Sequence, residues 1–249
     1  MKRLLLFIII VILLVFQMAT EEANEPFEIL NRIDSNMTFK NAYVEMDMVI
    51  NIKKRKIKKV MRSWSEGNSR SFIEFLSPAR DKGTKILKTG KIIKIYYPSA
   101  ERVMRLSGHM LRQSMMGSDM SYEDMTERSK ELKEDYTGKM QMDEILDGQK
   151  CYVLTLTSKK KKQTYFKRKM WVDKEKYIGL KEELYSKSGK LVKVSKVIEI
   201  KLFKNRYYPV EMTMEDKLRK NSSTRIVIKK IDFNIDIPDE MFTERMLLK

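Results

Sequence analysis

The stretch VEMDMVINI, residues 44–52, decides the fold class, because apolar residues occupy alternate positions along it. Successive side chains of an extended chain point to opposite faces, so this alternation predicts a β-strand with one apolar and one polar face. Similar patterns recur roughly a dozen times along the chain, separated by turns rich in Gly, Asn, Asp and Lys. The sequence therefore predicts a mainly β protein with long antiparallel strands.

One segment interrupts this pattern between residues 108 and 129. Its apolar spacing becomes helical, and five methionines fall between Met110 and Met125. The Gly117-Ser118-Asp119 turn breaks the segment, and Ser121 followed by Asp124 resembles a capping box. We expect Gly117, Ser118, Asp119 and Asp124 to be structural, because the turn sets the direction of the helices and Asp124 caps one of them.

A sheet of ten or more strands twists and curls strongly. We therefore predict a single antiparallel, open β half-barrel that does not close. An amphipathic helix is predicted over residues 25–37, before the first strand. The helical insert at 108–129 is expected to cover the concave face as a hinged lid. No repeat or low-complexity linker divides the chain, so residues 20–249 are expected to form one domain.

The inward-facing candidates are apolar residues with aromatic and methionine side chains. Many such residues form the core of any β protein, but a partly closed sheet also leaves a concave face that needs a cover. Methionine is unbranched and polarizable, so it adapts to varied apolar ligands. The predicted lipid-binding cavity consists of Met46, Met48, Trp64, Ile73, Phe75, Ile95, Tyr97, Met104, Met110, Leu111, Met115, Met116, Met170, Leu184 and Val194.

The N-terminus predicts export. Met1-Lys2-Arg3 precedes thirteen uninterrupted apolar residues, Leu4 to Phe16. A basic start with an apolar core of this length is typical of a secretory signal, since a membrane-spanning helix needs about 20 apolar residues. We expect residues 1–19 to be a signal peptide and the protein to be periplasmic. Gln17 makes cleavage after Ala19 imperfect, so an uncleaved anchor in the inner membrane remains the alternative.

The composition narrows the possible chemistry. A net charge of +17 suggests an anionic partner such as a membrane surface, although lysines on the solvent faces of strands explain much of it. Export argues against nucleic acid as a partner. His109 and Cys151 are the only residues of their types and cannot build the usual zinc sites. His109, Ser118 and Asp119 lack a nucleophile-elbow context. We expect no enzyme activity, no metal and no cofactor.

Several short motifs follow one another in a recognisable order. They are Ser77-Pro78, Gly83-Thr84, Ile95-Tyr96-Tyr97-Pro98, residues 117–124 (GSDMSYED), Trp171-Val172-Asp173, the Glu183-to-Tyr185 strand with Gly189-Lys190, and residues 237–242 (IPDEMF). In this order they resemble the bacterial outer-membrane lipoprotein-sorting proteins of the LolA-like superfamily. The resemblance covers nearly the whole mature chain. It implies an open β half-barrel whose concave face is plugged by helices.

The resemblance also implies a function. Proteins of this superfamily are associated with carrying acylated proteins or lipids across the periplasm, so we expect a carrier that delivers acyl chains towards the outer membrane. The basic charge and the lysine-rich hairpins depart from the best-known carriers, which leaves lipoprotein and free lipid or glycolipid as alternative cargoes. An inner-membrane transporter is a further expected partner. The alternative function is a periplasmic sensor or adaptor that binds a membrane protein, with lipid only as a signal.

Overall fold

The computed structural model describes residues 25–125 and 129–249, and its core is one thirteen-stranded antiparallel sheet. The predicted signal peptide lies outside the described residues. The strands are β1 (Asn41–Ile52), β2 (Arg55–Glu66), β3 (Arg70–Ser77), β4 (Lys85–Thr89), β5 (Ile92–Tyr97), β6 (Arg102–Leu106), β7 (Tyr136–Leu146), β8 (Gln149–Ser158), β9 (Lys167–Asp173), β10 (Gly179–Tyr185), β11 (Leu191–Phe203), β12 (Arg206–Asp216) and β13 (Ser222–Phe233).

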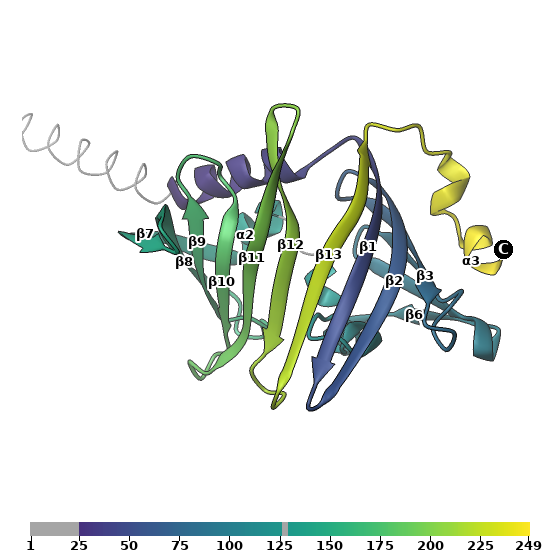
Figure 1. Cartoon of the computed structure of the whole chain (residues 1–249). Helices are drawn as coiled ribbons and strands as arrows, with labels where there is room; N and C mark the ends of the chain where they lie inside the picture. The colour runs from purple at the N-terminus through teal and green to yellow at the C-terminus, as the bar shows by residue number, and fades with distance from the viewer. Residues whose placement is uncertain (1–24, 126–128) are drawn as a thin grey trace, which may run out of the picture.

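The strand order explains why the sheet stays open. It runs β6-β5-β4-β3-β2-β1-β13-β12-β11-β10-β9-β8-β7, so the first and last strands of the chain pair in the middle of the sheet. The edge strands are β6 and β7, which do not pair with each other (Figure 1). The prediction of an open antiparallel half-barrel is thus confirmed.

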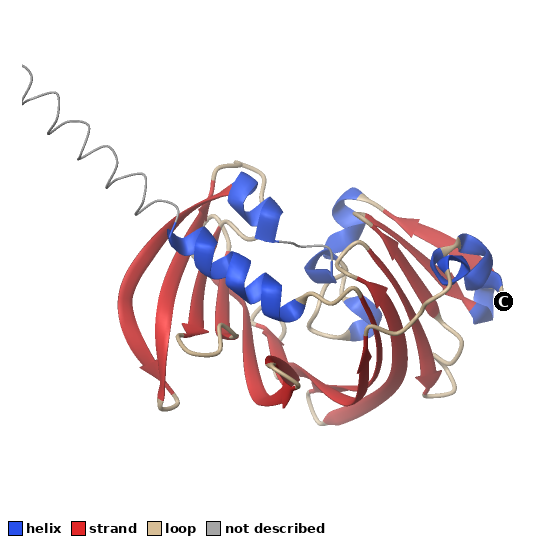
Figure 2. Cartoon of the chain, turned by 90° about the horizontal axis from the view of Figure 1, so that it is seen from above, coloured by secondary structure: helices blue, strands red, loops and turns tan. Residues whose placement is uncertain are grey.

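The sheet curves around helical segments on its concave side, as seen from above in Figure 2. They are an N-terminal helix (residues 25–37), the 3₁₀ turns η2 (Gly108–Arg112), η3 (Met115–Gly117) and η4 (Glu123–Met125), and helix α2 (Ser129–Asp135). We call β1–β6 with residues 108–125 the insert half, and β7–β9 with the N-terminal helix and α2 the helix half. In the described ranges, no helix is long and apolar enough to cross a bilayer.

In the helix half, the N-terminal helix packs closely on the concave face of the sheet. Phe27 and Leu30 are buried, and they pack with Tyr136 of β7 and with apolar residues of β8 and β9. Gly138 of β7 permits this approach, because a Cβ atom there would lie 2.9 Å from the Cβ of Pro26. The prediction of a helix over residues 25–37 is confirmed.

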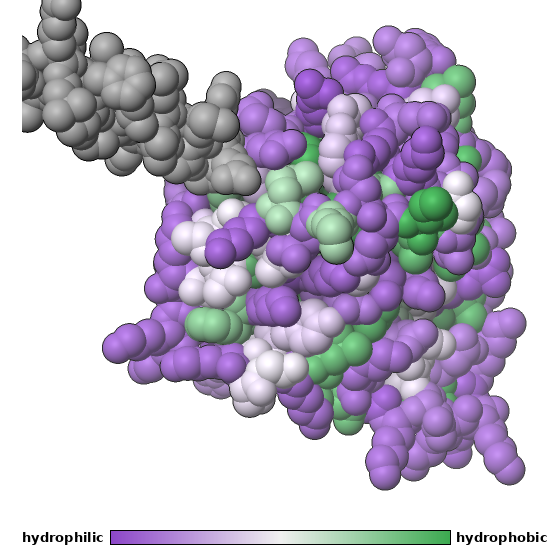
Figure 3. All heavy atoms as spheres, turned by 90° about the vertical axis from the view of Figure 1, so that its left-hand side faces the viewer, coloured by the Kyte–Doolittle hydropathy of each residue, from purple (hydrophilic) through white to green (hydrophobic). Residues whose placement is uncertain are grey.

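The convex face carries a separate cover over strands β2–β6. After β13, the chain forms η5 (Asp239–Phe242) and α3 (Glu244–Leu248), which lie outside the curve (Figures 1 and 2). Phe242 and Leu247 are buried there against Phe72 and Leu87. Viewed from the β7 side, the surface of the molecule is mostly hydrophilic with small separate apolar spots (Figure 3). The large apolar cluster of the insert half is instead buried, between the sheet and residues 108–125.

Candidate functional site: the concave face under the insert

Most of the predicted cavity residues come together in one cluster between the sheet and the insert. Alternate residues of each strand point inward, and the 3₁₀ turns lay further apolar side chains over them. The predicted residues in this cluster are Met46, Met48, Ile73, Phe75, Ile95, Tyr97, Met104, Met110, Leu111, Met115 and Met116. The cluster is tightly packed, since Met48 and Phe75 have no solvent-exposed area. A ligand in this place must therefore displace side chains.

Four predicted residues lie elsewhere. Trp64 is on the convex face and packs near Phe72, because it lies three positions after inward-facing Met61 on the same strand. Met170 packs against the core of the helix half. Leu184 is buried on the concave side, opposite Lys193 of β11. Val194 follows Lys193 and so faces the convex side.

The structure adds residues to this cluster that were not among the predicted ones. Further methionines join it, namely Met61, Met120, Met125 and Met212. Beside them, Lys59 of β2 has only 2% of its surface exposed and forms an ion pair with buried Asp81. Lys59 is two positions from Met61 on β2, and it pairs with Met48 of β1. Strand alternation therefore puts Lys59 on the concave face, and the sequence alone could have predicted this. The cluster is thus rich in methionine, with one buried ion pair.

The first polar anchor of the insert is Asp119, whose side chain is completely buried. Thr224 of β13 donates its hydroxyl to Asp119 Oδ2 at 2.7 Å, and the Asp119 N–H donates to Thr224 Oγ1 at 2.8 Å. The backbone N–H of Asp216 also donates to Asp119 Oδ1, at 3.2 Å. Arg219 donates to the backbone oxygens of Ser118 at 2.6 Å and Gly117 at 3.1 Å. The 117–119 turn is therefore fixed to the β12–β13 end of the sheet.

The second polar anchor is Asp124. Its carboxylate accepts hydrogen bonds from Tyr165 Oη at 2.7 Å and Lys193 Nζ at 2.7 Å. The backbone N–H of Ser121 donates to the same carboxylate at 2.7 Å, and Ser121 Oγ accepts from the Asp124 N–H at 3.3 Å. This reciprocal pair has the geometry of a capping box. Residues 121–124 are thereby attached to β11 and to the segment before β9.

The part of the insert before these anchors is attached differently. Most of its backbone hydrogen bonds are local, since the N–H groups of Gln113, Met115 and Ser118 donate to carbonyls within the insert, and that of Met110 donates to Ser107 just before it. Apolar packing on the sheet is made by four side chains of this part, those of Met110, Leu111, Met115 and Met116. Residues 108–116 therefore contact the sheet mainly through side chains that can repack, and residues 113–115 are hydrogen-bonded to residues 118–122 of the insert. Residues 117–124 are held to the sheet by directed hydrogen bonds.

The Tyr122 phenol is buried from solvent beside the methionines of the cluster. Burial raises the pKa of Tyr122 above its usual value, and the neighbouring Tyr97 raises that pKa further. The Tyr122 phenol is therefore a neutral hydroxyl beside the methionines at neutral pH. Within residues 25–125 and 129–249, no group of three or more His, Cys, Asp or Glu side chains is placed to hold a metal ion.

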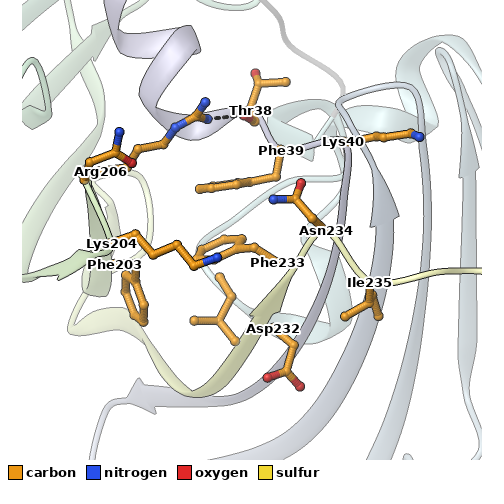
Figure 4. Close-up of a pocket in the computed structure, with 12 residues that line it drawn as sticks. Thr38, Phe39, Lys40, Phe203, Lys204, Arg206, Asp232, Phe233, Asn234 and Ile235 are labelled. Atoms are coloured by element: carbon orange, nitrogen blue, oxygen red, sulfur yellow. Dashed lines mark hydrogen bonds between the residues drawn. The ribbon is translucent and has the colours of Figure 1, made fainter.

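An open cavity adjoins the insert half at one end of β13 (Figure 4). Its volume is about 770 Å³, within the size range of small-molecule sites. Its walls come from the segment before β1, the β11–β12 turn and the end of β13. The lining residues are Thr38, Phe39, Lys40, Phe203, Lys204, Asn205, Arg206, Ile231, Asp232, Phe233, Asn234 and Ile235.

The cavity and the methionine cluster share one continuous apolar face. At the cavity, Phe233 of β13 pairs with Ala42 of β1. The next inward pairs along the two strands are Ile231 with Val44 and Ile228 with Met46. Ile226 is itself part of the methionine cluster. The sequence prediction missed this cavity because its aromatic rings come from three distant segments. Their only sequence signal is that Phe203 and Phe233 occupy strand ends beside polar turns.

Comparisons with known proteins agree with this geometry. A family model described as "-like: Uncharacterized protein" matches residues 67–249. A DUF1329 family protein from Desulfovibrio piger is 26% identical with a TM-score of 0.83, and the match covers 91% of this chain and 99% of that one. A LolA superfamily protein from Nitrosomonas europaea is 25% identical with a TM-score of 0.72, covering 88% and 97%.

A third solved structure shares the same fold. An outer membrane lipoprotein-sorting protein domain from Vibrio parahaemolyticus is 23% identical with a TM-score of 0.80, covering 90% of this chain and 98% of that one. No curated protein matches the chain significantly. The resemblance to the LolA-like superfamily that the ordered motifs indicated is confirmed.

Proposed function

The chain belongs to the family whose model matches residues 67–249, and on this premise we propose that it is a periplasmic carrier of acyl chains. It binds the acyl chain of a lipoprotein or lipid on the concave face of its LolA-like fold and delivers that chain towards the outer membrane. One observation carries the proposal: a methionine-rich segment, whose polar anchors to the sheet lie at its far end, covers an apolar face that continues along β13 to an open cavity.

The acyl chain needs room that the packed cluster does not offer. Residues 108–116 provide it when they move away from the sheet and give up the hydrogen bonds of residues 113–115 to residues 120–122. The anchors at Asp119 and Asp124 meanwhile hold the rest of the insert in place. The displaced methionines then repack along the ligand, because their unbranched side chains accept many shapes. Burial contributes about 0.8 kcal/mol per methylene, so a long acyl chain offsets the cost of this opening.

Release follows from the same energetics. The sequence contains no phosphate-binding glycine loop that would couple release to a nucleotide. The acyl chain therefore leaves when an acceptor offers a more apolar environment. An inner-membrane transporter as donor and an anionic membrane surface as docking site belong to the same proposal. The export signal predicted over residues 1–19 and the net charge of +17 support them.

The proposal is tested by uptake of a fluorescent acyl probe, a dansylated undecanoic acid, and by native mass spectrometry of the purified protein. Met115→Asp and Met116→Asp place a carboxylate in the cluster and are expected to weaken probe binding at least tenfold. Lys160→Ala is the matched control, since Lys160 is exposed and far from the cluster in sequence. Circular dichroism spectra establish that each variant is folded.

Three outcomes contradict the carrier function. The first is protein that stays free of lipid and takes up no probe. The second is an equal effect of all three substitutions, which means that the probe adheres to the basic surface. The third is a stoichiometric protein partner whose binding survives both aspartate substitutions while the probe does not bind, which identifies an adaptor instead.

A further inference from the structure

The open cavity at the end of β13 has an aromatic interior. Phe39 stacks on Phe233 with ring centroids 3.6 Å apart, and Phe203 meets Phe233 edge-on at 5.5 Å. Tyr208 packs edge-on against the same rings, and burial raises the pKa of its phenol. Flat, rigid rings of this kind form a wall that an extended acyl chain can lie against.

The rim of the cavity is cationic. The β11–β12 turn contributes Lys204, which has a left-handed backbone (φ 56°), and Arg206. Arg206 Nη1 donates to the backbone oxygens of Ser35 at 3.2 Å and Thr38 at 3.0 Å, which fixes the turn to the end of the N-terminal helix. Its guanidinium carbon lies 5.3 Å from the centre of the Phe39 ring. The turn is therefore held in place with its positive charges above the aromatic rings.

The directions of the side chains separate the charged groups of the cavity. In Figure 4, Lys204 extends across the cavity towards Phe233, whereas Lys40 and Asp232 point away from its centre. Asp232 also pairs with Lys230 at 2.9 Å. The charge that faces the cavity is therefore positive.

From this geometry we propose that the ligand is a single-chain anionic amphiphile, with its phosphate or carboxylate at Lys204 and Arg206. Its acyl chain passes Phe233 and Ile231 and continues along β13 towards the methionine cluster. The inference rests on the proposed carrier function and specifies its ligand class. A charged head at the rim and a buried tail also fix the direction in which the ligand enters, with the tail leading.

The test compares two amphiphiles of equal chain length by calorimetry below their micelle concentrations. Dodecyl phosphate is anionic, and monolauroylglycerol is uncharged. Lys204→Ala is expected to weaken dodecyl phosphate binding about tenfold, as expected for a lost hydrogen bond to a charged group. Binding of monolauroylglycerol is expected to change less than twofold. Lys187→Ala is the matched control and is expected to affect neither ligand, because Lys187 is an exposed lysine that does not line the cavity. Phe203→Ala is expected to weaken both.

The remaining outcomes overturn one claim or the other. Equal binding of both amphiphiles, or an equal effect of Lys204→Ala on both, contradicts the anionic head site and leaves the carrier function intact. Saturation of the site by inorganic phosphate at the same affinity as dodecyl phosphate identifies a phosphate site and contradicts the amphiphile. Failure of the unaltered protein to bind either amphiphile overturns the carrier function itself.

Discussion

The two halves of the concave face are covered in different ways. In the helix half, an amphipathic helix presses Phe27 and Leu30 onto β7–β9, close enough for Pro26 to require a glycine opposite it. In the insert half, short 3₁₀ turns lay methionines on β1–β6, and polar anchors hold only the end of the insert. Under the proposed carrier function, the helix half is the fixed core and the insert half is the part that we expect to open.

The side chains explain this difference. Phenylalanine and leucine have few rotamers and fill a defined shape, so a cover made of them fits one surface well. Methionine has three rotatable bonds in its side chain, so it can fill irregular spaces of many shapes. A segment that packs on the sheet both with and without a bound acyl chain is better made of methionine, because methionine fits both surfaces.

The largest expected effect comes from weakening the fixed cover. Leu30→Ala removes a buried side chain from the helix half and is expected to lower the free energy of unfolding by about 2–5 kcal/mol. Met110→Ala in the insert half is the matched comparison, and we expect a smaller loss because Met110 is only half-buried. Urea unfolding measures both. Equal losses would show that the two covers do not differ in stability.

The close approach at Gly138 offers a second test of the fixed half. Gly138→Ala adds a Cβ that meets Pro26, and we expect it to lower the free energy of unfolding by about 2–3 kcal/mol, in the upper range for overpacking. Gly148→Ala controls for glycine removal in a turn, although its positive φ (82°) adds some strain of its own. Unchanged stability in Gly138→Ala would mean that the helix can shift.

A third test loosens the anchored end of the insert. Thr224→Val keeps the shape of the side chain but removes both hydrogen bonds between the Thr224 hydroxyl and buried Asp119, at an expected cost of about 1–2 kcal/mol. Hydrogen exchange measured by mass spectrometry should quicken in peptides that cover residues 115–122. Peptides from the N-terminal helix serve as the internal control. Faster exchange in both regions would indicate global loosening and not a separate insert.

A fourth test concerns the methionines themselves. Met115→Leu conserves volume, so we expect it to change the free energy of unfolding by less than about 1.5 kcal/mol. The branched side chain should nevertheless narrow the range of acyl chain lengths that bind. Titrations with saturated fatty acids of increasing length check this expectation. An unaltered length profile would mean that adaptable packing plays no part in binding.

The smallest effect at neutral pH is expected from Tyr122. Because burial raises its pKa in the folded state, the folded protein keeps a proton that the unfolded chain loses above about pH 10. Folding is therefore unaffected by this group below that pH and loses up to about 1.4 kcal/mol per pH unit above it. Tyr122→Phe should remove this part of the slope in unfolding experiments at pH 9 and 11. An identical slope in the variant would contradict the dry environment of the insert.

Strand periodicity was enough to predict much of the fold. Alternation in residues 44–52 placed Met46 and Met48 on the concave face, and helical spacing placed the N-terminal helix. The prediction that Trp64 lines the cavity is wrong. It lies an odd number of positions from inward-facing Met61, so its side chain points to the convex face in spite of its aromatic character. Counting positions along β2 from Met61 would have excluded it.

The anchors and the cavity could not be predicted from local patterns. The partners of Asp119 and Asp124 are Thr224 and Lys193, which are distant in the sequence and meet them only through the strand order. The same holds for the cavity, where Phe39 and Phe233 stack because the first and last strands pair. These contacts depend on tertiary topology, which a single sequence does not specify locally.

The central claim is that the insert half, and not the helix half, receives the acyl chain. A photoactivatable palmitic acid with a diazirine near the chain end tests it directly, with crosslinked peptides identified by mass spectrometry. We expect crosslinks in residues 108–116 and in strands β1 and β13, and their loss when unlabelled palmitate is added in excess. Competable crosslinks confined to the N-terminal helix and β7–β9, or no competable crosslinks at all, would contradict it.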